Sequence, residues 1–154
     1  MKLFGIQFQD GGYTLVELLV VIAIFSILSM GLVVAVNPVN NLRKAADAMV
    51  INDISALARG AEAYANSHNG FYPATLEDLR LSDEVRLAED SPLGYSPYVY
   101  VAFPSGCVTG ATCTSITIVG EQKAQKFVAT PFLRFESQTG KTCHVVTVSS
   151  LCPL

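Results

Sequence analysis

The sequence feature that most constrains this chain is an apolar run from Leu15 to Val36, in which Glu17 is the single ionisable residue. At about 1.5 Å per residue, a helix over this run spans about 33 Å, close to the hydrocarbon thickness of a bilayer. Signal-peptide apolar regions are shorter, at about 7–15 residues, and precede a small-residue cleavage site. Here the small pair Gly11-Gly12 comes before the run. The run therefore predicts a helix that anchors the chain to a membrane.

The rest of the 154-residue chain is long enough to form one small domain with its own core. The net charge of −3 gives no basic field, and no specific nucleic-acid site is evident. We find no Gly-rich phosphate loop, paired-His metal motif or G-x-S-x-G elbow in the sequence. The sequence therefore predicts a protein that is not an enzyme, with no catalytic residues, no cofactor and no metal site.

All four cysteines, Cys107, Cys113, Cys143 and Cys152, lie in the last third of the chain. Their spacings exceed the roughly two-residue gaps of zinc knuckles, so two disulfides in an oxidising compartment are favoured over a zinc site. We favour the local pairs Cys107–Cys113 and Cys143–Cys152, which require the chain to turn near Ser149. The pairing of Cys107 with Cys152 and of Cys113 with Cys143 remains open at this stage.

Beyond Pro38 the apolar residues recur at helical spacing as far as Ala65, and the pair Asn69-Gly70 is a helix-stop signal. This stripe begins at Leu42 and includes Met49, and we expect it to pack on a sheet. The polar residues of the segment, Asp47 among them, are expected on the solvent-facing side, where Arg43 and Asp47 form an i,i+4 pair. Thr75 is predicted to cap a short helix over 76–81, with Asp78 completing a partial capping box.

Four segments rich in β-branched and aromatic residues follow, separated by turn signals, at 95–103, 114–121, 126–136 and 142–149. They predict an antiparallel meander of four strands. Pro131 falls within the third segment and indicates an edge position or a bulge, because proline cannot donate a ladder hydrogen bond. The predicted fold class is α+β, with one face of the sheet covered by the amphipathic helix.

The string Gly12-Tyr13-Thr14-Leu15-Val16-Glu17, leading directly into the apolar run, resembles the N-terminal signature of type IV pilins and type II secretion pseudopilins. The resemblance implies cleavage by a prepilin peptidase between Gly12 and Tyr13, N-methylation of Tyr13, and retention of Glu17 in the mature protein. The later string Gly70-Phe71-Tyr72-Pro73 is similar to the segment that follows the long helix in major pseudopilins and related pilins.

The resemblance implies a pilin-like organisation along the chain. It comprises a leader peptide at 1–12, a transmembrane and assembly helix at 13–36, an amphipathic helix at 37–69, an αβ-loop at 70–94, and a disulfide-bonded antiparallel sheet region at 95–154. The apolar half of the long helix protrudes, and the amphipathic half packs on the four-stranded sheet.

The function implied is that of a pilin, the structural subunit of a type IV pilus-like filament. The subunit is expected to span the inner membrane once, with its C-terminal domain extracytoplasmic, and to enter an extracellular homo-oligomeric filament. Its partners are the lipid bilayer before assembly, the prepilin peptidase, and the inner-membrane assembly platform. A pseudopilin of a secretion or DNA-uptake system is the alternative, and a monomeric membrane-tethered binding domain is a third.

Overall fold

A computed structural model describes residues 13–35, 37–82 and 91–153, and for residues 32–35 it describes the backbone alone. The predicted leader peptide at 1–12 thus lies outside the described residues. The chain divides into two compact units, Met1–Pro38 and Val39–Leu154, which are treated separately below. The first unit contains helix α1 (Leu15–Ala35), and the second contains nearly all of α2 (Pro38–Ser67) and the rest of the fold.

The break between α1 and α2 lies at Asn37, whose φ is 44°. A residue before proline disfavours the α region, and Pro38 suits the first position of a new helix because its missing N–H needs no partner there. The sequence Asn37-Pro38 therefore accounts for the separation of the two helices at this point. At its other end α2 finishes at Ser67, and the predicted stop is made by Asn69 (φ 56°) and Gly70 (φ 87°). The N–H of Gly70 donates to the carbonyl of Ala65 at 2.8 Å, which satisfies one of the last helix carbonyls.

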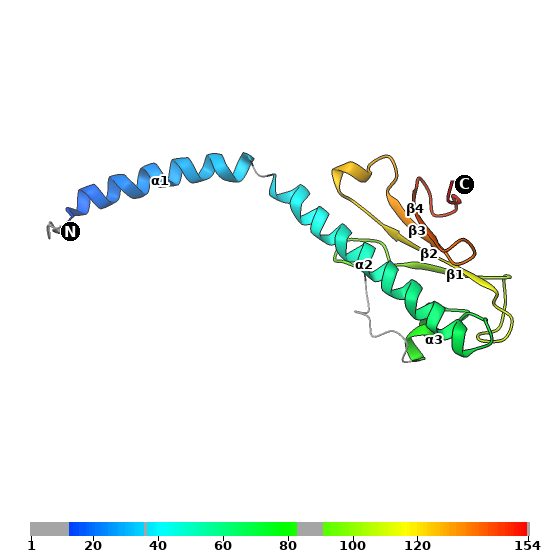
Figure 1. Ribbon diagram of the computed structural model, residues 1–154. Coiled ribbons are helices and arrows are strands. Elements are labelled where there is room, and N and C mark those ends of the chain that lie inside the picture. Colours follow the sequence, from blue (N-terminus) through cyan, green and yellow to red (C-terminus); the bar gives the residue numbers. More distant parts are fainter. Residues whose placement is uncertain (1–12, 36, 83–90, 154) are drawn as a thin grey trace, which may run out of the picture. The chain divides into compact units, whose positions relative to one another are not determined.

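The second unit consists of α2 laid along one face of a four-stranded antiparallel sheet (Figure 1). The strands are β1 (Val99–Phe103), β2 (Ser115–Glu121), β3 (Phe132–Glu136) and β4 (Lys141–Val145), in the order β1-β2-β3-β4. Val101 pairs with Thr117, and Ile118 pairs with Phe135. The α+β class and the meander predicted from the sequence are confirmed.

The core lies between α2 and the sheet, where large apolar side chains meet small ones. Each large aliphatic side chain buried there contributes about 1.5–3 kcal/mol. Gly120 allows the closest approach: a Cβ at this position would lie 2.9 Å from both the Ile54 Cδ1 and the Val50 Cγ1 atoms of α2. The members of the core are Val50, Ile54, Leu57, Ala58, Ala61 and Tyr64 of α2, Leu79, and Ile116, Ile118, Leu133 and Phe135 of the sheet.

The buried stripe of α2 differs from the predicted one in its first turns. Leu42 and Met49 are exposed, whereas Asp47 and Val50 are buried. The physical reason is that backbone donors from the loop after β2 reach this end of the helix, so a carboxylate faces the sheet side there. The prediction that Asp47 lies on the solvent side and pairs with Arg43 is therefore wrong in its first part: Asp47 is 2% exposed.

Helix α3 (Leu76–Leu81) forms as predicted, with Thr75 as its N-cap. The Thr75 hydroxyl accepts from the Asp78 N–H at 3.1 Å, and the Asp78 carboxylate accepts from the Thr75 N–H at 3.2 Å. This is the complete reciprocal capping box. The Asp78 carboxylate also accepts from the Thr109 hydroxyl at 2.5 Å, which ties α3 to the loop closed by Cys107 and Cys113.

Three predicted strands are too long. The segment 95–103 forms strand only from Val99. The segment 126–136 forms strand only from Phe132, after the 3-10 helix η1 (Gln125–Phe127), so Pro131 precedes β3 and is neither on an edge strand nor in a bulge. Its carbonyl instead accepts from the Gln122 N–H at 2.6 Å. The segment 142–149 leaves the sheet after Val145, because the chain must turn back to bring Cys152 to Cys143.

Candidate functional site

The N-terminus of α1 holds the residues that the resemblance singles out. The Thr14 hydroxyl accepts from the Glu17 N–H at 3.3 Å, and the Thr14 carbonyl accepts from the Leu18 N–H at 3.2 Å. Thr14 is therefore the N-cap of α1, and Glu17 occupies the third helical position. This role of Thr14 was not predicted, although the pattern Thr-x-x-Glu before an apolar run is a known signal for the start of a helix.

Glu17 is exposed in the first turn of α1, where a carboxylate is stabilised by the positive end of the helix dipole. Tyr13 directly precedes the capped turn, and its side chain is 79% exposed. Gly12 lies outside the described residues, so the structure describes only the Tyr13 side of the predicted cleavage bond. The roles of Gly12, Tyr13 and Glu17 in processing and assembly stay predictions.

Helix α1 presents apolar side chains all round. Over residues 15–31 every side chain is exposed, including Leu15 and Met30 at the two ends of this stretch. The Ser26 and Ser29 hydroxyls each donate to a carbonyl one turn back, at 2.7 Å, so they present no free donor. A helix that is apolar on all sides needs an apolar environment around it. In the part of the chain that the structure describes, no helix meets the length and hydropathy of a membrane span.

A carboxylate of α2 holds the loop that follows β2. Asp47 Oδ1 accepts from the Lys123 N–H and from the Tyr95 hydroxyl, and Asp47 Oδ2 accepts from the Ala124 N–H, each at 2.8 Å. About two turns earlier on the helix, Asn40 Oδ1 accepts from the Gln125 N–H at 3.1 Å. Three successive backbone N–H groups thus point at the first turns of α2. We call these contacts of Asn40 and Asp47 with the loop the helix–loop clamp.

Three tyrosines donate hydrogen bonds on the side of the sheet that faces the core. Burial, and then the hydrogen bond to Asp47, raise the pKa of Tyr95 to about 12. Burial also raises the pKa of Tyr98, whose hydroxyl donates to Asp53 Oδ2 at 2.6 Å. The Tyr100 hydroxyl donates to the Pro73 carbonyl at 2.9 Å. All three phenols therefore act as neutral donors. Tyr95 and Tyr98 attach the segment before β1 to α2, and Tyr100 attaches β1 to the αβ-loop.

The four cysteines form two disulfides, Cys107–Cys113 and Cys143–Cys152. This is the local pairing that the sequence favoured. The first closes the loop between β1 and β2, and the second brings the C-terminal segment back to β4. The Cys152 N–H also donates to Glu136 Oε1 at 3.2 Å, so the end of the chain is attached to the sheet at two points.

The arrangement is pilin-like in layout, with a long N-terminal helical region followed by an antiparallel sheet that covers α2. Residues 8–33 match the family model of the prokaryotic N-terminal methylation motif. The chain thus carries the prepilin signature shared by type IV pilins and pseudopilins. No curated protein and no solved structure matches the chain.

Proposed function

We propose that this protein is a pilin, the structural subunit of a type IV pilus-like filament. The observation that carries the proposal is that the methylation motif, at residues 8–33, extends over most of α1, whose described side chains are exposed and, apart from Glu17 and two serines, apolar. In the proposed sequence of events α1 first lies in the inner membrane, with Val39–Leu154 outside the cytoplasm. A prepilin peptidase cuts between Gly12 and Tyr13 and methylates Tyr13, and an assembly platform then transfers the subunit to the filament.

Glu17 is the proposed assembly residue. When α1 leaves the lipid and packs among copies of itself, the Glu17 carboxylate loses its water, and an unpaired buried carboxylate is very costly. The protonated α-amine of Tyr13 in a neighbouring subunit would compensate that charge. Because Glu17 is the one charge in the apolar run, this pairing would set the axial register between subunits, as a single buried polar residue does in a coiled coil.

Mass spectrometry of the native N-terminus tests the processing step. We expect a mature chain that begins at N-methylated Tyr13. An intact Met1 in the membrane fraction of cells that contain an active prepilin peptidase would instead indicate a membrane tether that is never cleaved.

A substitution tests the assembly step. Glu17→Ala should leave membrane insertion and cleavage intact but abolish filaments, whereas Glu77→Ala, which removes an exposed carboxylate on α3, should leave filament yield unchanged. Filament yield is measured by shearing and sedimentation. A normal yield from Glu17→Ala would refute the proposed register contact.

A pseudopilin of a secretion or DNA-uptake system remains the second candidate, because the methylation motif is common to pilins and pseudopilins. The two differ in the abundance of the protein and the length of the filament. Long, abundant surface filaments favour the pilin, and short periplasmic ones, with secretion or uptake genes nearby, favour the pseudopilin.

A further inference from the structure

The turn that ends α2 carries a chemically reactive pair of residues, Asn69-Gly70. Asn69 is the one asparagine in the sequence that a glycine follows. Both residues are exposed, and a Cβ built on Gly70 would meet no atom of a non-neighbouring residue within 4 Å, so the turn is open to water. Asparagine is a labile residue, because the main-chain nitrogen of the next residue can attack its side-chain amide. A glycine in the next position hinders that attack least, because it has no Cβ.

The backbone distinguishes Asn69 from the exposed asparagine nearest to it. Asn66 and the Ser67 that follows it lie within α2, where main-chain N–H groups are bonded along the helix. Asn69 lies beyond the helix and has a φ of 56°, in the left-handed region. The sequence and the structure therefore both single out Asn69 as the asparagine most open to attack by its neighbour.

The nitrogen that would attack takes part in the cap of α2. The Gly70 N–H donates to the Ala65 carbonyl at 2.8 Å, and the Phe71 N–H donates to the His68 carbonyl at 3.0 Å. A main-chain nitrogen attacks only after it has lost its proton, so the bond from Gly70 to Ala65 must open first. Helix ends open locally at a small fraction of the free energy of global unfolding. The cap should therefore slow the attack without preventing it.

The segment after the cap is joined to the loop closed by Cys107 and Cys113. The Tyr72 N–H donates to the Cys113 carbonyl at 2.8 Å, and the Tyr72 carbonyl accepts from the Gly110 N–H at 3.1 Å. This reciprocal pair of bonds fixes the position of Tyr72 relative to the loop. Because Asn69 comes shortly before Tyr72 in the chain, a change in main-chain length at position 69 acts directly on these two bonds.

We propose that Asn69 is a site of spontaneous conversion to isoaspartate, and that the conversion detaches Tyr72 from the disulfide-closed loop. The deprotonated Gly70 nitrogen bonds to the side-chain carbonyl carbon of Asn69, the bond from that carbon to Nδ2 breaks, and ammonia leaves with the proton. Water then opens the resulting succinimide ring at the former main-chain carbonyl carbon, so the chain runs through the side chain. The net change consumes one water and releases one ammonia. It does not depend on the proposed role in a filament.

Two properties of isoaspartate oppose the cap. The residue adds one carbon to the main chain, a lengthening of about 1.5 Å, which moves the Gly70 N–H away from the Ala65 carbonyl. It also places a free carboxylate beside the last carbonyls of α2, where the helix dipole is negative. The cap therefore does not re-form, and the displacement passes along the chain to Tyr72.

The first test follows the conversion itself. The full chain in lipid nanodiscs and a free peptide of residues 65–73 are aged side by side in mildly alkaline buffer and mapped by mass spectrometry, and isoaspartate is identified by its enzymatic methylation. We expect the mass gain of amide hydrolysis at Asn69 and none at Asn66. The rate in the folded chain should be about tenfold lower than in the peptide, the factor given by a hydrogen bond of about 1.4 kcal/mol.

The second test follows the consequence by hydrogen exchange. In the converted chain the amides of Tyr72 and Gly110 should exchange about fivefold faster than in the fresh chain, the factor for the loss of about one hydrogen bond. Amides of β4 should not change. Asn69→Gly is the matched control, because glycine adopts the left-handed conformation and has no side chain to react. This variant should exchange alike before and after ageing.

Three results would each overturn the proposal. The first is an Asn69 that stays unmodified in the folded chain long after the tenfold lower rate would have converted it. The second is conversion in the folded chain at the rate of the free peptide, which would show that the cap does not hold the Gly70 nitrogen. The third is unchanged exchange at Tyr72 and Gly110 in the converted chain, which would show that the loop stays attached.

Discussion

Replacing Asp47 by alanine removes the central acceptor of the helix–loop clamp. The carboxylate accepts three hydrogen bonds of 2.8 Å, and bonds to a charged group contribute about 1.5–3 kcal/mol each. Two of the three donors have alternatives in the variant. Lys123 is exposed, so its N–H can bind water, and the Tyr95 hydroxyl also lies 3.3 Å from the Arg43 carbonyl. Ala124 is fully buried, so its N–H is left without an acceptor.

Leaving a buried donor unpaired costs about 1–3 kcal/mol, and the two weakened bonds add to it. We therefore expect Asp47→Ala to lower the free energy of unfolding by about 3 kcal/mol. For a unit of this size, that corresponds to a decrease in Tm of about 10–15 °C. Asp47→Asn should fall between the natural chain and Asp47→Ala, because the amide oxygen can still accept while the amide nitrogen faces a backbone N–H.

The assay is thermal unfolding of the purified full chain, followed by the near-ultraviolet circular dichroism of its tyrosines. Asp53→Ala is the matched control, because Asp53 lies on the same helix and accepts a hydrogen bond from Tyr98 at a partly exposed position. We expect that control to cost about 1 kcal/mol. If Asp47→Ala lowers Tm no more than Asp53→Ala does, the helix–loop clamp does not stabilise the fold.

Three further perturbations have defined outcomes. Gly120→Ala should destabilise the fold by about 1–3 kcal/mol in a urea titration, because the added Cβ would lie 2.9 Å from Ile54; an unchanged midpoint would show that α2 shifts freely. The pKa of Tyr95 is raised to about 12, so its neutral form is favoured in the folded state. Its contribution to stability is complete below about pH 10, the ordinary pKa of tyrosine, and is lost as the pH rises toward 12. Tyr95→Phe should therefore flatten the loss of stability between pH 10 and 12, and an identical slope would refute this. Replacing Cys143 and Cys152 by serine should cost about 2–3 kcal/mol and speed amide exchange over residues 146–152, as read by mass spectrometry, while exchange in β2 changes far less.

The sequence was sufficient for those parts of the fold that depend on local patterns. Helical spacing in α2, the stop at Asn69-Gly70 and the capping box at Thr75 each rest on residues close together in the chain, and the structure contains all three. Likewise, the pairing of cysteines within each half of the sheet region followed from what short loops can close.

Long-range partners account for what the sequence analysis missed. A carboxylate at position 47 is expected on the solvent side unless the N–H groups of Lys123 and Ala124 are known to face it. The residues around position 47 give no sign of these donors, which lie 76 and 77 positions further along the chain. The late start of the third strand has another cause. Residues 125–127 form the 3-10 helix η1 in place of an extended strand, and Pro131, directly before β3, has no N–H to donate to a ladder.

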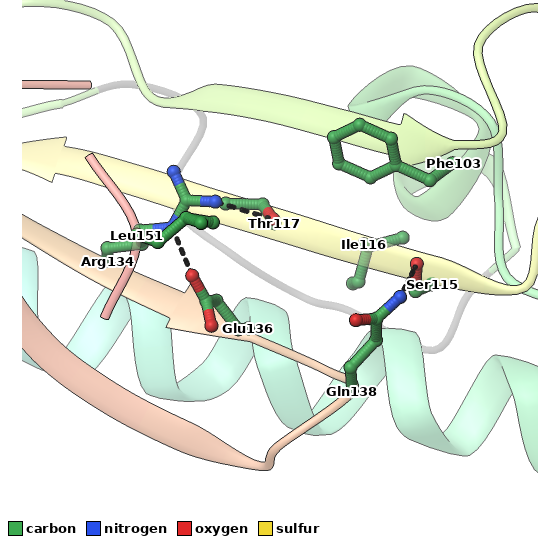
Figure 2. Close-up of a pocket in the computed structure, with 8 residues that line it drawn as sticks. All are labelled: Phe103, Ser115, Ile116, Thr117, Arg134, Glu136, Gln138 and Leu151. Carbon is green, nitrogen blue, oxygen red and sulfur yellow. Dashed lines mark hydrogen bonds and ion pairs between the residues drawn. The ribbon is translucent and has the colours of Figure 1, made fainter. Parts of the chain in front are cut away.

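The sheet face turned away from α2 carries an apolar groove of about 620 Å³, lined among others by Val99, Val101 and Arg134, which could not be predicted from the sequence for a similar reason. It requires the row of β1 side chains, the floor at Arg134 and the returning C-terminal segment, which come together only after the sheet has formed (Figure 2). The order of the residues gives the alternation along β1, but it does not reveal which of the two faces α2 covers.

The uniform surface of α1 leaves it without a preferred side. Because the described part of the helix is apolar in every direction and its two serine hydroxyls are turned onto their own backbone, rotating it about its long axis changes no contact between polar and apolar groups. Hydrophobicity can therefore hold such a helix among others, but it cannot select the angle at which it meets them. That angle must be selected by the sizes of the side chains, from Leu15 to the gap at Gly31, and by the single carboxylate at Glu17. A substitution that changes the size of an apolar side chain on α1 should thus alter the angle between packed helices before it weakens their association.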